Sequence, residues 1–280
     1  TTALLQGVSF ANADTGTVVG SGGTVLRTTN GGAAWTSQAS GTTADLFDVC
    51  FTDADTGTAV GSGGTILRTT NGGTTWTTQW TGTMNSLYGV SLSNADTGTV
   101  VGQNGSIFHT INGGIYWTGQ EYPISFFYAI FFFDSVNGLM GGERGKIRRT
   151  TDGGLTWFPA TVDSSLFAFW PLLHFKFYSR YYGVALGGRM DMVGIVWMTT
   201  NGGERWFASG PAGEPLHGFH FIDSLNLLAI GGDFDVGSGM VRSKDRGRTW
   251  EYTYLGIWGE ARALAFRTPS EGYAPLGFPG

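Results

Sequence analysis

The feature that most constrains the fold of this chain is an eight-residue motif that recurs along its length. TTNGGAAW at residues 28–35 returns as TTNGGTTW at 69–76, and four further variants follow. The six motifs end at tryptophans that are spaced by 41, 41, 40, 49 and 44 residues. A regular period of roughly 40 to 50 residues is typical of proteins in which every repeat is one small packing unit. The chain is therefore expected to be built from repeats.

Each repeat contains the signals for four short strands. LFDVCF (46–51) alternates as a strand does, DADTG supplies a turn, and GTAVG and TILRTT predict two more strands. After NGG the chain turns again, which predicts a fourth strand that begins at Trp76. No segment shows a 3.6-residue period, so helical repeats are not expected. The units start near residues 5, 46, 87, 127, 172, 216 and 261.

Four short antiparallel strands per unit, repeated radially, predict an all-β fold, a seven-bladed β-propeller that forms a single domain over residues 1–280. There are seven unit starts but six motifs. The seventh unit stops at GYAPLGFPG (272–280), before a third strand, so its blade is expected to be incomplete. An open sheet edge is normally covered, and we expect a further domain or subunit to cover the edge near 272–280.

Composition and charge narrow the function classes. The chain has 47 glycines and 13% charged residues, which suits tight turns between buried strands. A net charge of −5, with RGKIRR (144–149) as the basic cluster, argues against nucleic acid as a partner. There is no apolar run of 18 residues, so no membrane span is expected. A single cysteine, Cys50, excludes an internal disulfide framework.

The residue types of the motif indicate a turn clamp. Asn30 can close an Asx-turn, Gly32 can supply a positive φ, and Trp35 can fold back as an apolar plug. Six similar copies on one rim favour this structural role over a set of ligand sites. The residues given the structural role are Asn30, Gly32, Trp35, Asn71, Gly73, Trp76, Asn112, Gly114, Trp117, Asp152, Gly154, Trp157, Asn201, Gly203, Trp206, Asp245, Gly247 and Trp250. The cations just before the motifs are expected to stack beside these tryptophans rather than form a basic stripe: Arg27, Arg68, His109, Arg149 and Arg242.

The repeats differ in the loops expected around the axial channel, between the second and third strands and between one unit and the next. Units four to seven carry long loops there, such as GGDFDVGSG (231–239) and VDSSLFAFWPLLH (162–174). Loops on a rigid scaffold commonly carry function, although these loops could instead pack together to close a wider channel. The candidate ligand-binding residues are Glu143, Arg144, Trp170, His174, Arg189, Asp191, Asp233, Asp235, Trp258, Glu260 and Arg262.

Catalysis is not favoured by these residues. Asp191 with Asp233 or Asp235 could form the carboxylate pair that glycoside hydrolysis needs, but carboxylates at loop tips are usually solvated. DFD (233–235) lacks the further carboxylate of a calcium loop. No catalytic residue, metal site or cofactor is therefore predicted, and an enzyme is disfavoured without being excluded.

The pattern Ser/Thr-x-Asp/Asn-x-Gly-x-x-Trp resembles the Asp box, or BNR repeat, of sialidases, xyloglucanases, sortilin-type receptors and the photosystem II assembly and stability factor family. GSGGTILRTTNGGTTW (61–76) and GGERGKIRRTTDGGLTW (141–157) are most similar to repeats of the last family. That resemblance implies a non-catalytic seven-bladed propeller that holds partner proteins during assembly. The Thr-, Asn- and Gly-rich early repeats look more like a secreted, cell-surface or periplasmic module.

The sequence thus predicts a non-enzymatic binding or scaffold module that takes a protein or glycan on the axial face of blades four to seven. One alternative is a carbohydrate-active protein, a lectin or a sialidase- or xyloglucanase-like glycosidase, with Trp170 and Trp258 as stacking platforms. Another is a structural subunit of a surface assembly without a ligand.

Overall fold

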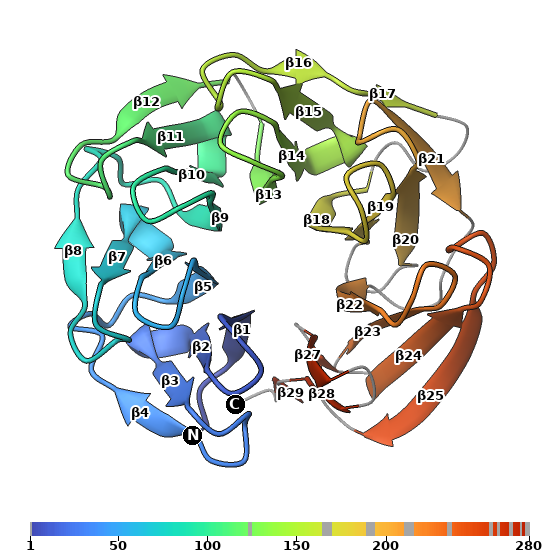
Figure 1. Ribbon diagram of the computed structural model, residues 1–280, viewed down its shortest axis with the longest axis horizontal. Helices are drawn as coiled ribbons and strands as arrows, with labels where there is room; N and C mark the ends of the chain where they lie inside the picture. Colours follow the sequence, from blue (N-terminus) through green and yellow to red (C-terminus); the bar gives the residue numbers. More distant parts are fainter. Residues whose placement is uncertain are drawn as a thin grey trace.

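The chain forms a ring of radially arranged β-sheets around a central channel (Figure 1). The computed structural model describes residues 2–122, 125–163, 170–188, 194–209, 216–233, 237–257, 260–261, 264–268, 271–274 and 276–277. Each blade is an antiparallel meander, with its first strand nearest the channel and its fourth strand on the rim (Figure 1). The prediction of an all-β propeller with four-stranded blades is confirmed.

Six blades have the four predicted strands. Blades one to three consist of β1 (Leu5–Phe10), β2 (Gly16–Gly20), β3 (Val25–Thr28), β4 (Thr36–Gln38); β5 (Leu46–Phe51), β6 (Gly57–Gly61), β7 (Ile66–Thr69), β8 (Thr77–Gln79); and β9 (Leu87–Leu92), β10 (Gly98–Gly102), β11 (Ser106–Thr110), β12 (Thr118–Glu121). Blades four to six consist of β13 (Phe127–Phe132), β14 (Gly138–Gly142), β15 (Ile147–Thr150), β16 (Phe158–Pro159); β18 (Leu172–Phe177), β19 (Gly183–Gly187), β20 (Ile195–Thr199), β21 (Arg205–Ser209); and β22 (Leu216–Phe221), β23 (Leu227–Asp233), β24 (Gly237–Ser243), β25 (Glu251–Ile257).

The connections show how the units differ. In the first four blades a three-residue 3-10 turn joins the second and third strands: η1 (Ser21–Gly23), η2 (Ser62–Gly64), η3 (Gln103–Gly105) and η4 (Glu143–Gly145). In blade six the predicted long loop at 231–239 is largely a hairpin extension, because β23 and β24 continue to pair as far as Asp233 and Gly237. Between blades four and five, β17 (Thr161–Val162) pairs in parallel with β21 and becomes a fifth strand of blade five.

The number of blades differs from the predicted seven. Beyond the six complete blades, the described residues form only two-stranded pairs, of β26 (Glu260–Ala261) with β29 (Leu276–Gly277) and of β27 (Ala265–Thr268) with β28 (Glu271–Tyr273). Strand β27 contacts both β1 and β22, so its pair lies between the first and sixth blades (Figure 1). Within residues 1–280, this last unit lacks the motif that precedes the fourth strand in each of the other six units.

Apolar side chains between neighbouring sheets form the core. One cluster joins blades one and two through Val19, Val25, Leu46, Val49 and Leu67, which are almost fully buried. All five residues of strand β6 are buried, because the second strand of a blade is covered on both faces by its neighbours. Burial of this kind contributes roughly 25 cal/mol per Å² of apolar surface and is the main force that holds the ring together.

The repeated motif closes each outer hairpin on itself. In blade two the Thr69 hydroxyl oxygen accepts the N–H of Gly73 at 2.8 Å, and the Asn71 side-chain oxygen accepts the N–H of Thr75 at 3.0 Å. Gly73 has a φ of 82°, a left-handed conformation that favours glycine. In blade four the Trp157 ring lies edge-on to Phe132, with centroids 6.0 Å apart. The motif therefore ties the rim hairpin to the first strand of its own blade.

Two of the cations before the motifs, Arg27 and Arg149, contact groups of the next blade instead of stacking beside a motif tryptophan as predicted. Arg27 lies over the Phe51 ring of the next blade, 4.9 Å from its centroid, and donates to the Thr17 hydroxyl and the Ala54 carbonyl. Arg149 instead pairs with Glu204 of the next blade, at 2.8 Å. Arg27 reaches the turn between the first two strands of blade two, where the Ala54 carbonyl lies, and Arg149 reaches the turn between the third and fourth strands of blade five, where Glu204 lies. These two arginines connect neighbouring blades.

Candidate binding site in the central channel

A β-bulge near the start of every inner strand directs side chains into the channel. The register shifts between Leu46 and Asp48 in β5, and at the equivalent position in the inner strands of the other five blades. A bulge places two residues opposite one residue of the partner strand and so re-aims a side chain. As a result Phe47 and Asp48 both line the channel, while Leu46 and Val49 enter the core between blades.

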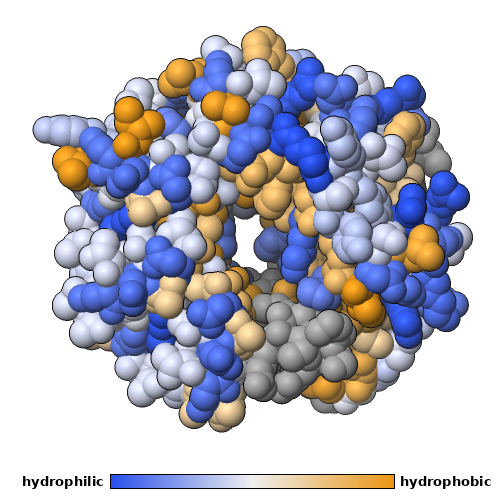
Figure 2. Space-filling view, in the orientation of Figure 1, coloured by the Kyte–Doolittle hydropathy of each residue, from blue (hydrophilic) through white to orange (hydrophobic). Residues whose placement is uncertain are grey.

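The channel contains a cavity of about 250 Å³. Figure 2 shows the centre of the ring open and bordered by both hydrophobic and hydrophilic residues. The second and third residues of the inner strands provide most of the lining: Gln6, Gly7, Phe47, Asp48, Tyr88, Tyr128, Ala129, Leu173, His174, His217 and Gly218. The cavity is thus built from strands of all six blades rather than from loops.

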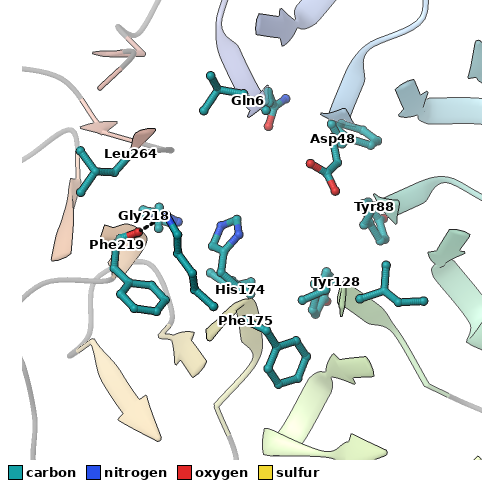
Figure 3. Close-up of a pocket in the computed structure, with 17 residues that line it drawn as sticks. Gln6, Asp48, Tyr88, Tyr128, His174, Phe175, Gly218, Phe219 and Leu264 are labelled. Atoms are coloured by element: carbon teal, nitrogen blue, oxygen red, sulfur yellow. Dashed lines mark hydrogen bonds between the residues drawn. The ribbon is translucent and has the colours of Figure 1, made fainter. Parts of the chain in front are cut away.

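Two large polar side chains face each other across this cavity. At the third position of the inner strands the six blades carry Gly, Asp, Gly, Ala, His and Gly, so that only Asp48 and His174 have a long side chain at this position. Figure 3 shows the carboxylate of Asp48 and the imidazole of His174 directed into the channel from opposite walls. Gly7 cannot be replaced by a larger residue without a clash, because a Cβ there would lie 2.9 Å from the Cα of Asp48. The small residues at this position in the other blades leave room for the Asp48 and His174 side chains.

The Asp48 carboxylate is held by backbone groups of two blades. One oxygen accepts the N–H of Val49 at 2.9 Å, and the other accepts the N–H of Val90 in blade three at 3.0 Å. Burial disfavours the charged form and raises the pKa of Asp48 to about 7, although both hydrogen bonds act in the opposite direction. The carboxylate is therefore partly ionised near neutral pH.

Blades five and six supply a basic wall, formed by His174, Lys176 and His217. The Lys176 ammonium donates to the Phe219 carbonyl of blade six at 3.2 Å (Figure 3), and burial lowers its pKa to about 8. The His174 side chain is exposed to the channel, but the channel itself is enclosed by the surrounding blades. Desolvation, with the nearby His217 and Lys176, therefore lowers the pKa of His174 to about 4. At neutral pH this imidazole is uncharged.

An aromatic arc, formed by Phe47, Tyr88 and Tyr128, lines blades two to four. The ring centroids of Phe47 and Tyr88, and those of Tyr88 and Tyr128, are each 5.3 Å apart. Burial raises the pKa of Tyr128 to about 12, and the negative charge of Glu143 adds to this shift. The Phe126 ring stacks on Tyr128, with centroids 6.3 Å apart, and the Phe126 carbonyl accepts the N–H of Glu143 in η4 at 3.0 Å. The arc therefore extends from the cavity toward the face that carries the turns between second and third strands.

Known proteins share the repeat and the architecture. A family model for the photosynthesis system II assembly factor YCF48 matches residues 34–124. The structure of YCF48 from Cyanidioschyzon merolae superposes with a TM-score of 0.76 at 20% identity, covering 99% of this chain and 94% of that one. A structure of YCF48 bound to D1 peptide gives a TM-score of 0.74 at 19% identity, with 98% and 90% covered. This chain is a BNR-type β-propeller related to the photosystem II assembly factor family.

The likeness to other propellers concerns the fold alone. The GH74 xyloglucanase from Xanthomonas campestris superposes with a TM-score of 0.76 at 14% identity, and this BNR-type propeller spans about half of that enzyme, 51% of its chain. No curated protein matches the sequence significantly. Within the described residues, no helix has the length and apolar character that a membrane crossing requires, and no group of three or more His, Cys, Asp or Glu is placed to hold a metal ion.

The structure brings together some of the residues predicted at the axial face. Glu143 and Arg144 lie in η4, whose Gly145 donates its N–H to the Trp170 carbonyl at 2.7 Å. His174 was predicted in a loop, but it lies within β18 and lines the cavity, because the inner strand already begins at Leu172. Asp233 and Glu260 lie in β23 and β26, with side chains outside the described residues. The remaining candidates lie wholly outside the described residues: Arg189, Asp191, Asp235, Trp258 and Arg262.

The channel residues themselves were missed, with the exception of His174. Asp48, Tyr88, Tyr128 and Lys176 belong to inner strands, whose alternation was interpreted as core and repeat rather than as a site. A signal was nevertheless present. At the third strand position an acid and an imidazole replace the Gly or Ala of the other units, and such a departure from the repeat needs a reason.

Proposed function

We propose that this propeller is a non-enzymatic module that binds a protein partner and holds a peptide segment of it at the axial face. The observation that carries the proposal is the aromatic arc, which continues from the cavity through Phe126 to the η4 turn at the mouth of the channel. Aromatic rings on a rigid scaffold contribute large contact areas at little entropic cost and are enriched where proteins bind one another. The bound D1 peptide of the related YCF48 structure supports a peptide as the ligand class.

Binding is favoured over glycoside hydrolysis by the charges that line the cavity. Among its described lining residues there is a single carboxylate, that of Asp48. A glycosidase needs a pair of carboxyl groups on the two sides of the scissile bond. The imidazole opposite Asp48 and the ammonium of Lys176 do not replace the second carboxyl group. Glycan binding without hydrolysis remains the alternative that the experiment has to exclude.

Peptide selection on the immobilised propeller tests this proposal. We expect enriched peptides to bind a Tyr88→Ala/Tyr128→Ala double variant at least about tenfold more weakly, since each lost ring removes buried contact area. The matched control is Tyr116→Ala on the rim, where the side chain is 76% exposed. Enriched peptides that depend on Tyr116 instead of the arc would contradict the axial site. Turnover of a glycan by the unmodified protein would overturn the non-enzymatic assignment.

As part of the same proposal, the propeller is a secreted, cell-surface or periplasmic module. Support comes from the early blades, whose rims are rich in Thr, Asn and Gly and poor in charge. Fractionation of the source cells with an antibody against the chain tests the location. Recovery in the cytoplasmic fraction would refute it.

A further domain or a partner subunit is proposed to cover the edge of β28. Among the described residues this strand pairs with β27 and with no third strand, and open edges promote unwanted pairing. Light scattering of the 280-residue chain is the direct measurement. Self-association is expected, and a stable monomer that resists aggregation would count against the proposal.

A further inference from the structure

The strongest unexplained feature of the channel is an acid without a counter-charge. Asp48 takes part in none of the ion pairs found among the described residues; both of its hydrogen bonds come from backbone N–H groups. Moving a carboxylate out of bulk water is costly unless a cation compensates it. Blades one and three carry glycine at this position, so the ring closes without an acid there. Asp48 therefore needs an explanation other than closure of the fold.

The groups around Asp48 favour a positive charge. Phe47 precedes it on the same strand, and the rings of Tyr88 and Tyr128 continue the aromatic arc along the same side of the cavity. The faces of aromatic rings attract cations, the more strongly where water is excluded. An acid beside several aromatic rings is the combination that recognises ammonium and guanidinium groups.

The basic wall opposite does not convert the cavity into an anion site. The Lys176 ammonium is still mostly charged at neutral pH, but it is held at the wall by the Phe219 carbonyl at 3.2 Å and forms no ion pair with Asp48 among those found in the described residues. His174 is uncharged at neutral pH, because its pKa is lowered to about 4 by burial and neighbouring charge. An anion in this cavity would also have to approach Asp48. Charge complementarity thus favours a cation on the side of blades two to four.

The size of the cavity limits what can enter. At about 250 Å³ it lies just below the roughly 300–1,000 Å³ of typical small-molecule pockets, which suits one side chain rather than a folded element. The aromatic arc leads from this cavity through Phe126 to the η4 turn at the mouth of the channel. A peptide lying across the mouth can therefore place one extended side chain in the channel.

We propose that the channel takes up one lysine or arginine side chain of the bound partner, which pairs with Asp48 and lies against Phe47, Tyr88 and Tyr128. This inference rests on the proposed function, because it assigns the chemistry of the residue that the peptide inserts. The inference also predicts that a small molecule carrying the same side chain binds in the channel without the rest of the peptide.

Titration with blocked amino acids tests the inference. The probes are N-acetyl-lysine amide and N-acetyl-arginine amide, with N-acetyl-norleucine amide as a neutral match for lysine and N-acetyl-glutamate amide as the anion. Resonances of labelled tyrosines, assigned with Tyr88→Phe and Tyr128→Phe variants, report occupancy of the arc. Saturable shifts are expected with the two cations and none with the other two probes. Equal binding of the norleucine probe, or tighter binding of the glutamate probe, would overturn the inference.

Two variants show whether Asp48 carries the effect. Asp48→Asn keeps an oxygen that can accept a backbone N–H but removes the charge, and is expected to weaken both cations by about tenfold or more. The matched control outside the cavity is Asp14→Asn, which removes an exposed carboxylate of blade one and is expected to change affinity by less than roughly threefold. Unchanged binding by Asp48→Asn would refute the pairing. Native tyrosine spectra of both variants exclude unfolding as the cause.

The pH dependence of the affinity provides a second readout. The titratable groups that share the cavity with Asp48 are Tyr88 and Tyr128 on the same side and His174, Lys176 and His217 on the basic wall. Between pH 6 and 8 the titration of Asp48, whose pKa is about 7, increases its negative charge, so the lysine probe should bind more tightly. The increase should be absent in Asp48→Asn. A flat profile in the unmodified protein would contradict the inference.

The results separate this inference from the proposed function. If selected peptides depend on the arc but tolerate Asp48→Asn and replacement of their basic residues, the propeller binds peptides and the inference fails. If the cationic probes bind but selection yields no peptide that depends on the arc, the channel recognises cations and the proposed protein-binding function fails.

Discussion

The rim and the channel of this propeller are made by the same six repeats, yet they follow opposite rules. On the rim, position after position repeats: the hydroxyl of Thr69 in blade two and that of Thr150 in blade four both accept the N–H of the second motif glycine, at 2.8 and 2.9 Å. In the channel, the third position of the inner strand changes from Gly to Asp to His around the ring. The rim closes each blade, whereas the channel carries the individual chemistry of each unit.

This difference explains how a repeat protein acquires a site. Each repeat contacts mainly its neighbours, so contacts that close a blade must recur in every blade. The inner strands meet at the axis, where one side chain from each blade shares a single cavity. A substitution there changes the cavity once, without affecting blade closure. Substitutions in the repeated rim motif should therefore reduce stability more than substitutions in the channel.

The largest effect is expected at a rim tryptophan. Trp206 is fully buried, its ring lies 6.0 Å from that of Phe177, and its N–H donates to the Gly203 carbonyl at 2.9 Å. Trp206→Ala should lower the free energy of unfolding by about 3–5 kcal/mol, as large-to-small changes in cores do. Denaturant titration measures this. Trp80→Ala, at a side chain that is 68% exposed, should stay within about 0.5 kcal/mol. Equal effects at the two sites would contradict a packing role for the motif.

The motif hydroxyl comes next. Thr69→Val keeps the shape but leaves the buried N–H of Gly73 without its acceptor. The expected loss is about 1–3 kcal/mol of stability, the cost of an unsatisfied buried donor. Thr75→Val, at an exposed motif position, serves as the control and should have little effect. Thermal unfolding of both variants decides whether the repeated hydroxyl is structural.

In the channel, the stability of Asp48→Asn relative to the unmodified protein should rise with pH. The folded pKa of Asp48 is raised from 3.8 to about 7, so the folded state binds more protons than the unfolded state between pH 4 and 7. Stability attributable to Asp48 is therefore complete below pH 4 and is lost as the pH rises to 7. After allowance for water in the channel, the relative gain of the variant between pH 4 and 8 should be on the order of 1–2 kcal/mol. The hydrogen bond that the Asn side chain cannot accept lowers the stability of the variant at every pH and does not change this slope.

The quantity to measure is the difference in the free energy of unfolding between the unmodified protein and Asp48→Asn at each pH, rather than the stability of either protein alone. His174 and His220 have pKa values lowered to about 4, so their contribution rises with pH in the same window and opposes that of Asp48. It cancels in the difference between unmodified protein and Asp48→Asn. A difference that is constant from pH 4 to 8 would show that Asp48 is not desolvated in the folded state.

The smallest effect is expected for His174→Gln. This side chain is exposed to the channel, and substitutions at such positions usually change stability by less than about 0.5 kcal/mol. Calorimetric unfolding at pH 7 is a sufficient measurement. A loss above about 1 kcal/mol would mean that the imidazole holds blades together and that the channel, like the rim, is structural.

Much of the fold could be predicted from periodicity alone. The strand predicted at 46–51 is β5, Leu46–Phe51, because alternation and flanking turn residues report local structure directly. The fourth strand begins one residue after the predicted Trp76, at Thr77, since the tryptophan itself belongs to the turn. The fifth strand of blade five, β17, could not be predicted: two residues carry no pattern, and their pairing with Arg205 and Trp206 is a tertiary event.

The site was harder to predict from the sequence than the fold, because a β-bulge determines which side chains face the channel. Strict alternation in LFDVCF would send Phe47 and Asp48 to opposite sides of the strand. The bulge between Leu46 and Asp48 brings both into the channel, and no residue type in that stretch signals a bulge. The sequence pattern therefore indicated a site in the loops. His174 was among the candidates because it was assigned to a loop, although it lies within β18.

The parallel strand β17 has a consequence for how the ring opens. The amide of Thr161 donates to Glu204 at 2.9 Å and that of Asp163 donates to Trp206 at 2.8 Å, so the segment leaving blade four is bonded to blade five. In a linear repeat array, each repeat can unfold separately from its neighbours. The hydrogen bonds of β17 should instead make blades four and five unfold as one cooperative unit. The amides of this unit should exchange with deuterium together, and later than those of a blade without such a connection.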